Sequence, residues 1–304
     1  MSSILRVVAC TLLAFYAGRC LCADTTSDVL VFYSDTSKFQ SAVAESLDTK
    51  YKQELVGAPI KLITDYDLSK VQATSIVISL GNHAEIDEQL TRLPNSVIYV
   101  NNTRQNAETR RNKFYTNIDI NHPPCRHLRL IKIINSEWIN IGYLSSDSND
   151  ERLVQLKHCA ATLGLQIISA TITDQSSIPG ATDLLLRDSD VLLALPDTSI
   201  YNSHSVKNIL LTAYRHRIPV IGFSDNFVIA GALAAVYSAP EHIADQLTRL
   251  IRQGKTTDKE HTSGDIPPEY YSVSVNRQVA KSLNIEIQDV STIKSRLNKM
   301  EAQQ

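Results

Sequence analysis

The feature that constrains the fold most is an alternation between two kinds of segment along the chain. Short runs rich in β-branched residues are each followed by a polar turn and by a longer stretch in which apolar residues recur at helical spacing. In the first part of the chain the strand-like runs are 29–33, 60–64, 75–80 and 97–100, and helices are predicted at 38–47 and 85–93. This alternation predicts an α/β fold with a parallel sheet.

The alternation is interrupted at His122-Pro123-Pro124 and then resumes. The second proline suits the first turn of a helix, and residues before a proline are pushed to extended backbone, so a crossing between two lobes is predicted near Asn121. A helix to residue 134 follows, and strands are predicted at 138–144, 166–170, 191–194 and 220–223. These runs predict a second parallel sheet.

One later helix has a clear start signal. Ser238 is followed by Pro240 in the first turn and by Glu241 three residues after the serine, which matches a capping box. This helix is predicted to end at Gly254. A polar loop, a strand at 271–275 and a short helix to residue 283 follow, and the polar tail is predicted to fray over its final dozen residues.

The first residues have the pattern of a signal peptide. Arg6 precedes an apolar run at 7–16 that is too short to anchor the chain in a bilayer, and small residues near Ala23 offer a cleavage point. Residues 1–23 are therefore predicted to be removed on export, and the mature protein is predicted to be soluble and periplasmic.

The cysteines support a disulfide better than a metal site. Three of the five cysteines lie in the predicted signal peptide, which leaves Cys125 and Cys159 in an oxidising compartment. The alternative is a metal cluster formed by these two cysteines with His122, His127 and His158. The spacing of the five residues is looser than that of zinc sites. A Cys125–Cys159 bridge and no metal are predicted.

Charge and motifs exclude two broad classes of function. A net charge of −2, a pI of about 6.4 and the lack of any Lys/Arg run argue against a nucleic-acid partner. The sequence has no nucleophile elbow, P-loop or His-Glu-x-x-His motif, and Asp197, Ser203 and His204 are only close in sequence, which does not make a triad. We expect neither an enzyme nor a bound cofactor.

Six segments of the second half match, in order, the pattern of one known family. They are IGYLSS at 141–146, LQIISATIT at 165–173, ALPDTS at 194–199, RIPVIGFSD at 217–225, AGALAA at 230–235 and VNRQVAKSL at 275–283. Over about residues 120–290 the chain thus resembles the tryptophan-type substrate-binding proteins of ABC transporters.

The resemblance implies a particular arrangement of the chain. The fold would be the type I periplasmic-binding one, with two doubly wound parallel-sheet lobes and a chain that crosses between them three times. The first lobe would comprise residues 24–121 and 239–262, and the second lobe residues 122–238 and 263–304. The helix after Ser238 would return to the first lobe, and the strand at 271–275 would rejoin the second.

Polar residues follow three predicted strands of the second lobe. Because loops after the carboxyl ends of parallel strands face the ligand crevice, these residues are candidates for a binding site. The candidates are Ser145, Ser146, Asp197, Thr198, Ser199 and Asp225. The two aspartates would hold a ligand ammonium group, and the hydroxyls would hold its carboxylate or other polar groups. The same residue types also cap helices and form turns. A purely structural role for these residues is therefore the alternative.

Two further points concern the ligand. By resemblance, the loop after the strand at 191–194 grips the ligand's polar end, although Thr198 stands where the family often has asparagine. Tyr201, Phe223 and Tyr237 would supply an apolar wall or, alternatively, ordinary core packing.

The sequence therefore predicts an extracytoplasmic solute-binding protein of an ABC-type uptake system. It would bind a small polar or amino-acid-like ligand between its lobes and deliver it to a membrane permease. The alternative is a periplasmic sensory or assembly module that uses the same lobes to bind a partner protein, because the first lobe keeps the strand and helix rhythm without most of the residues expected of the family.

Overall fold

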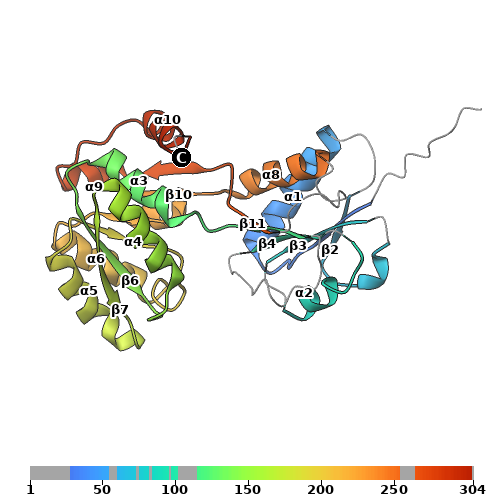
Figure 1. The fold of residues 1–304 in the computed structure, drawn as a ribbon, viewed down its shortest axis with the longest axis horizontal. Coiled ribbons are helices and arrows are strands. Elements are labelled where there is room, and N and C mark those ends of the chain that lie inside the picture. Colours follow the sequence, from blue (N-terminus) through green and yellow to red (C-terminus); the bar gives the residue numbers. More distant parts are fainter. Residues whose placement is uncertain are drawn as a thin grey trace, which may run out of the picture.

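The chain forms two α/β lobes, each built around a six-stranded sheet (Figure 1). The computed structural model describes residues 28–54, 60–72, 75–81, 84–95, 97–101, 115–253 and 264–302. The predicted signal peptide at 1–23 lies outside these residues. Within them, every helix is too short or too polar to cross a membrane. The predicted fold class is confirmed.

The strands of the first sheet all pair in parallel. In sheet order they are β11 (Gly264–Ile266), β5 (Tyr115–Asp119), β4 (Val97–Asn101), β3 (Ile76–Leu80), β1 (Val29–Phe32) and β2 (Ile60–Ile63). The four predicted runs correspond to β1 to β4. Strands β5 and β11 were not predicted, because β5 is largely polar and β11 has only three residues.

Helices cover both faces of this sheet. On β1, Val29 and Val31 pack in one core while Leu30 and Phe32 pack in the other, since successive residues of a strand face opposite sides. The first core includes α1 (Lys38–Glu54) and α8 (Pro240–Arg252), and the second includes α2 (Ala84–Leu90).

Helix α8 packs on α1 although most of the second sheet lies between them in sequence (Figure 1). The apolar face of α8 is buried, with Ile243 and Leu247 fully inaccessible to solvent. A Lys50–Asp245 ion pair of 2.5 Å joins the two helices at the edge of this contact. The helix after the second crossing thus lies against the first sheet.

The second sheet is parallel except at one edge. In sheet order its strands are β12 (Ser272–Val275), β10 (Ala234–Tyr237), β9 (Val220–Gly222), β8 (Val191–Leu193), β6 (Asn140–Ser145) and β7 (Gln166–Thr171). Strand β12 pairs antiparallel with β10. Strand β10 was not predicted as a strand.

Seven helices of the described residues accompany this sheet. They are α3 (Pro124–Ile134), α4 (Glu151–Leu163), α5 (Ile178–Arg187), α6 (Val206–Arg215), α7 (Asp225–Ile229), α9 (Arg277–Ser282) and α10 (Val290–Glu301). The prediction that the final dozen residues fray is wrong for residues 293–302, and residues 303–304 lie outside the described part of the chain. Ile293 and Leu297 of α10 are fully buried, and Glu301 forms an ion pair of 2.5 Å with Arg126 of α3.

The predicted capping box at Ser238 is also wrong in its details. The cap of α8 is Ala239, whose backbone N–H donates to Nδ1 of His242 at 3.2 Å. The hydroxyl of Ser238 instead donates to the carbonyl of Tyr270 at 2.6 Å. Ser238 therefore joins two of the segments that connect the lobes and does not cap the helix.

The third crossing lies later in the chain than predicted. The predicted boundary assigns residues from 263 onward to the second lobe, yet β11 pairs with β5 in the first sheet. The chain passes from β11 to β12 through residues 267–271. This shift places Asp265 and Pro267 on the first-lobe side of the space between the lobes.

A buried histidine links all three crossing segments. His122 lies in the first segment, Ser238 in the second and Tyr270 in the third. Since the Ser238 hydroxyl proton goes to the Tyr270 carbonyl, His122 Nε2–H donates to Ser238 Oγ at 3.2 Å. Arg126 Nη1 donates to His122 Nδ1 at 2.7 Å and to the Pro268 carbonyl at 3.0 Å. These contacts require a neutral His122.

The buried histidines His122 and His127 predict a loss of stability at mildly acidic pH. Burial, followed by the charge of Arg126, holds the pKa of His122 well below its ordinary value, and burial lowers the pKa of His127 to about 4. Below pH ~6.5 the unfolded chain protonates these rings while the folded chain does not, so stability falls as pH drops toward the folded pKa values. For His127 alone the loss between pH 7 and pH 5 is about 2 kcal/mol, and His122 adds to it.

Urea denaturation at the two pH values measures this loss. His127→Leu removes one titrating ring and should show a smaller drop in stability on acidification than the parent. His204→Gln, at an exposed position, should keep the full drop. An equal drop in the parent and in His127→Leu would contradict the lowered pKa of His127.

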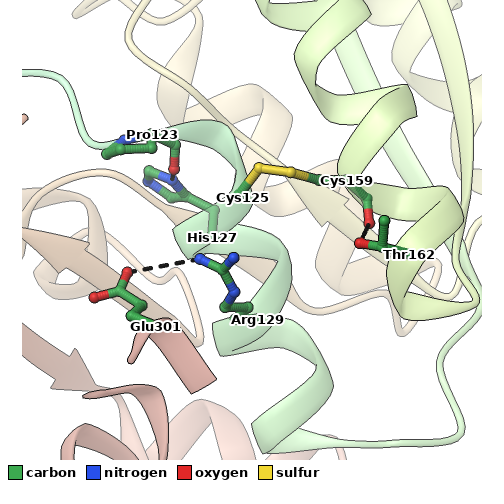
Figure 2. The surroundings of a disulfide bond; sticks show 7 residues. All are labelled: Pro123, Cys125, His127, Arg129, Cys159, Thr162 and Glu301. Carbon is green, nitrogen blue, oxygen red and sulfur yellow. Dashed lines mark hydrogen bonds and ion pairs between the residues drawn. A yellow bond between two sulfur atoms is a disulfide. The ribbon is translucent and has the colours of Figure 1, made fainter. Parts of the chain in front are cut away.

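The predicted disulfide is confirmed. Cys125 of α3 and Cys159 of α4 are bonded, with their Cα atoms 5.5 Å apart (Figure 2). Close to Cys125 on α3, Arg129 forms an ion pair of 3.8 Å with Glu301 of α10. Helix α3 is thus tied covalently to α4 and electrostatically to the C-terminal helix.

Candidate functional site

A cleft of about 780 Å³ lies between residues of the two lobes and of the crossing segments. Its lining combines residues that follow strands β6, β8 and β9 of the second sheet with residues next to β5 and β11 of the first. The carboxyl ends of parallel strands therefore meet here, as expected for a ligand crevice.

Asp150 organises the second-lobe wall of the cleft. Its carboxylate accepts hydrogen bonds from the hydroxyls of Tyr143 at 2.5 Å and Ser145 at 2.9 Å, and it caps α4 by accepting from the backbone N–H of Arg152 at 2.9 Å. Burial alone would raise the pKa of Asp150, but the hydrogen bonds from Arg152, Tyr143 and Ser145 lower it below its ordinary value. The carboxylate is therefore charged and fully partnered.

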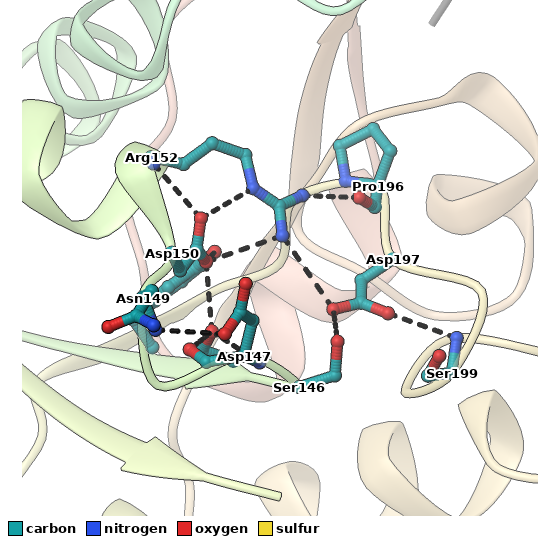
Figure 3. Close-up of polar contacts among 10 residues, drawn as sticks. Ser146, Asp147, Asn149, Asp150, Arg152, Pro196, Asp197 and Ser199 are labelled. Atoms are coloured by element: carbon teal, nitrogen blue, oxygen red, sulfur yellow. Dashed lines mark hydrogen bonds and ion pairs between the residues drawn. The ribbon is translucent and has the colours of Figure 1, made fainter. Parts of the chain in front are cut away.

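Arg152 projects from the first turn of α4 into the cleft, and sequence reasoning missed it. Its Nε donates to Asp150 Oδ1 at 3.0 Å, its Nη1 donates to the Pro196 carbonyl at 2.5 Å, and its Nη2 lies 3.7 Å from Asp197 Oδ2 (Figure 3). The side chain is 34 % exposed. The available signal was an arginine close after the polar turn that follows the predicted strand at 138–144.

Asp197 stands opposite Arg152 on the loop after β8. Its Oδ2 accepts from the hydroxyl of Ser146 at 2.7 Å, and its Oδ1 accepts from the backbone N–H of Ser199 at 3.0 Å (Figure 3). These bonds hold the carboxylate in one orientation at the wall of the cleft. Arg152, Asp150 and Asp197 together carry one positive and two negative charges.

The structure brings some predicted site residues together and separates others. Ser146, Asp197 and Thr198 line the cleft. Ser199 contributes its backbone N–H to Asp197. Ser145 is buried, and its hydroxyl serves Asp150.

Asp225 does not line the cleft with Asp197. It begins α7, and its carboxylate accepts a hydrogen bond from the hydroxyl of Ser274 on β12. This bond turns the carboxylate toward the edge strand of the sheet. The structure therefore does not pair the two aspartates that were predicted to share an ammonium group.

Aromatic side chains form part of the same wall. Tyr201 and Phe223 line the cleft and pack with ring centroids 6.1 Å apart. Burial, followed by the charge of Asp197, raises the pKa of Tyr201, so its hydroxyl stays protonated. That hydroxyl is buried and has no hydrogen-bond partner among the described residues.

The first-lobe side of the cleft is acidic. Asp119 and Asp265 line it, with Asn121 and His122 from the first crossing segment. Asp119 Oδ1 accepts from the Asn121 N–H at 3.0 Å, and Asp265 Oδ1 accepts from the Asn117 amide at 2.9 Å. These hydrogen bonds orient both carboxylates at the first-lobe side of the cleft.

Several solved structures share this fold. A conserved domain protein from Vibrio cholerae matches with a TM-score of 0.57 and 18 % identity over 90 % of this chain and 98 % of its own. An ABC domain in complex with L-Trp from Streptococcus pneumonia matches with a TM-score of 0.58 and 14 % identity over 89 % of this chain and 98 % of its own. The ligand-free, open structure of a substrate binding protein with adhesive properties from Clostridium difficile gives a TM-score of 0.66 and 14 % identity over 86 % of this chain and 96 % of its own.

Sequence comparison identifies the family. Among curated proteins, none matches the chain. The family model for the ABC transporter substrate binding protein, however, matches residues 116–296, which is more than half of the chain and includes the whole second-lobe wall of the cleft. The chain therefore belongs to the ABC transporter substrate binding protein family.

Proposed function

We propose that this protein is exported through its first 23 residues and binds a small zwitterionic, amino-acid-like solute between its lobes for uptake by an ABC permease. The observation that supports the ligand class is the pairing of Arg152 with Asp197 on one wall of the cleft, where opposite charges lie 3.7 Å apart. A zwitterion carries the complementary pair of charges at similarly short range.

Arg152 would receive the carboxylate of the solute. Its guanidinium is held in place by Asp150 and by the Pro196 carbonyl, so binding requires little further ordering of the side chain. The N-terminal end of α4, where Arg152 lies, also favours an anion because of the helix dipole. Thr198 lines the cleft on the adjacent loop and would add a hydroxyl.

Asp197 would receive the ammonium group. Its carboxylate is oriented by Ser146 and Ser199. Because Arg152 is also paired with Asp150, a bound ammonium would compensate the charge of Asp197 when the cleft closes and water leaves. Closure about the three crossing segments would also strengthen each contact by lowering the local dielectric.

A thermal-shift screen tests the proposal. The probes are the twenty amino acids, and for each hit its N-acetyl and carboxamide derivatives, which lack the ammonium or the carboxylate. A zwitterion at 1,000 times its Kd should stabilise the protein by about 4 kcal/mol and raise its melting temperature by several degrees. Both derivatives of a hit should give much smaller shifts. No shift with any amino acid would contradict the proposal and favour the partner-binding module.

A further inference from the structure

A second recess lies at the carboxyl edge of the first sheet. It has a volume of about 350 Å³ and is formed where β3, β4 and β5 end beside the start of α1. Apolar side chains that include Phe39, Leu80 and Ile120 make up most of its lining. Ile120 lines this recess while Asn121 lines the main cleft, so the two spaces adjoin along the chain that leaves β5.

Three polar side chains of the described part of the chain line the recess, and two of them form hydrogen bonds within the turn before α1. Gln40 Oε1 accepts from the Ser34 backbone N–H at 2.7 Å, and Ser37 Oγ accepts from the Gln40 backbone N–H at 3.4 Å. Both contacts stabilise the turn that leads into α1. The third side chain, that of Asn101, behaves differently.

The Asn101 side chain is buried in the wall of the recess. The residue is 1 % exposed, and neither its amide nitrogen nor its amide oxygen has a hydrogen-bond partner among the described residues. The Asn101 backbone carbonyl, by contrast, accepts a hydrogen bond from the Ile120 N–H at 2.9 Å. Buried polar groups are almost always hydrogen-bonded, and an unpaired one destabilises the fold. An apolar side chain of similar size would be more stable at this position.

The chemistry of the recess defines what would satisfy Asn101. Among the described residues no charged side chain lines the recess, so a charged ligand group would find no opposite charge there among them. The amide offers one donor group and one acceptor group. Its complement is a neutral group that donates and accepts at once, such as a carboxamide or a hydroxyl, carried on an apolar body that fills the rest of the space.

We propose that the Asn101 recess binds the side chain of the solute and selects one that ends in a carboxamide or hydroxyl group. This inference rests on the proposed function, in which Arg152 and Asp197 hold the head group from the other lobe. The ligand then spans the cleft, with its charged end on the second lobe and its neutral polar end on the first. Selectivity arises because an apolar analogue leaves the buried amide unpaired.

Calorimetry on matched pairs of amino acids tests the inference. The pairs are glutamine with methionine and tyrosine with phenylalanine, each measured with the parent, Asn101→Leu and the exposed control Asn208→Leu. The parent should prefer the polar member of at least one pair by tenfold or more. Asn101→Leu should lose that preference while Asn208→Leu keeps it. Without ligand, Asn101→Leu should also melt at a higher temperature than the parent.

The outcomes separate this inference from the proposed function. A parent that binds an amino acid through its head group, with a preference that Asn101→Leu leaves unchanged, would overturn this inference alone. A lower melting temperature for ligand-free Asn101→Leu would also overturn it, because the unpaired amide would then not destabilise the parent. A parent that binds no amino acid at all would overturn both.

Discussion

Replacing Asp150 by alanine should destabilise the protein by about 3–5 kcal/mol, the range found when one partner of a buried charge network is removed. The carboxylate accepts from Tyr143, Ser145 and Arg152, and it caps α4. Its loss would leave the buried Tyr143 hydroxyl unpaired and remove the helix cap, which by itself contributes about 1 kcal/mol. The fall should appear as a lower urea midpoint.

Asp147 provides the matched control for this prediction. It lies in the same loop but is exposed, and its carboxylate accepts from a single backbone N–H, that of Asn149, at 2.9 Å. Asp147→Ala should therefore cost about 1 kcal/mol or less. Similar losses for the two variants would mean that the network around Asp150 contributes no more than an ordinary surface turn.

Removing the disulfide should cost about 3–4 kcal/mol. Cys125 and Cys159 are 34 residues apart in sequence, and the bond restricts a loop of that length in the unfolded chain. The double substitution Cys125→Ser with Cys159→Ser should lower the urea midpoint accordingly, and the parent treated with a reductant should denature at the same midpoint as the double variant. A parent whose midpoint is insensitive to reductant would contradict this account.

The fold was largely predictable because its signals are periodic and local. The fully buried strand β1 is a continuous apolar run, β3 is apolar except for Ser79, and α1 and α8 repeat apolar residues at helical spacing. The failures occurred where tertiary contacts decide the structure. Helix α10 has only Ile293 and Leu297 fully buried, and its stability depends on α3 and on Arg126, which are distant in sequence. Ser238 is a residue type that often caps helices, but its hydroxyl donates to a carbonyl of another crossing segment.

The site was predictable only to the level of loops. Polar residues after β6 and β8 could be assigned to the crevice because the ends of parallel strands meet there. Which side chains face the cleft depends on hydrogen bonds that no local pattern encodes. Ser145 turns to Asp150, Asp225 turns to Ser274, and Arg152 reaches the cleft because Asp150 and Pro196 orient it.

The most direct test of the central claim is calorimetric titration of the amino acid that gives the largest thermal shift, against the parent, Asp197→Asn and Asp225→Asn. Asparagine keeps an oxygen for the Ser199 N–H, so Asp197→Asn should fold normally while it loses the charge that faces the ammonium group. We predict that Asp197→Asn binds at least tenfold more weakly, a loss of about 1.4 kcal/mol or more, whereas Asp225→Asn stays within about twofold of the parent. Parent-like affinity in Asp197→Asn would contradict the account, because the solute would then be held elsewhere.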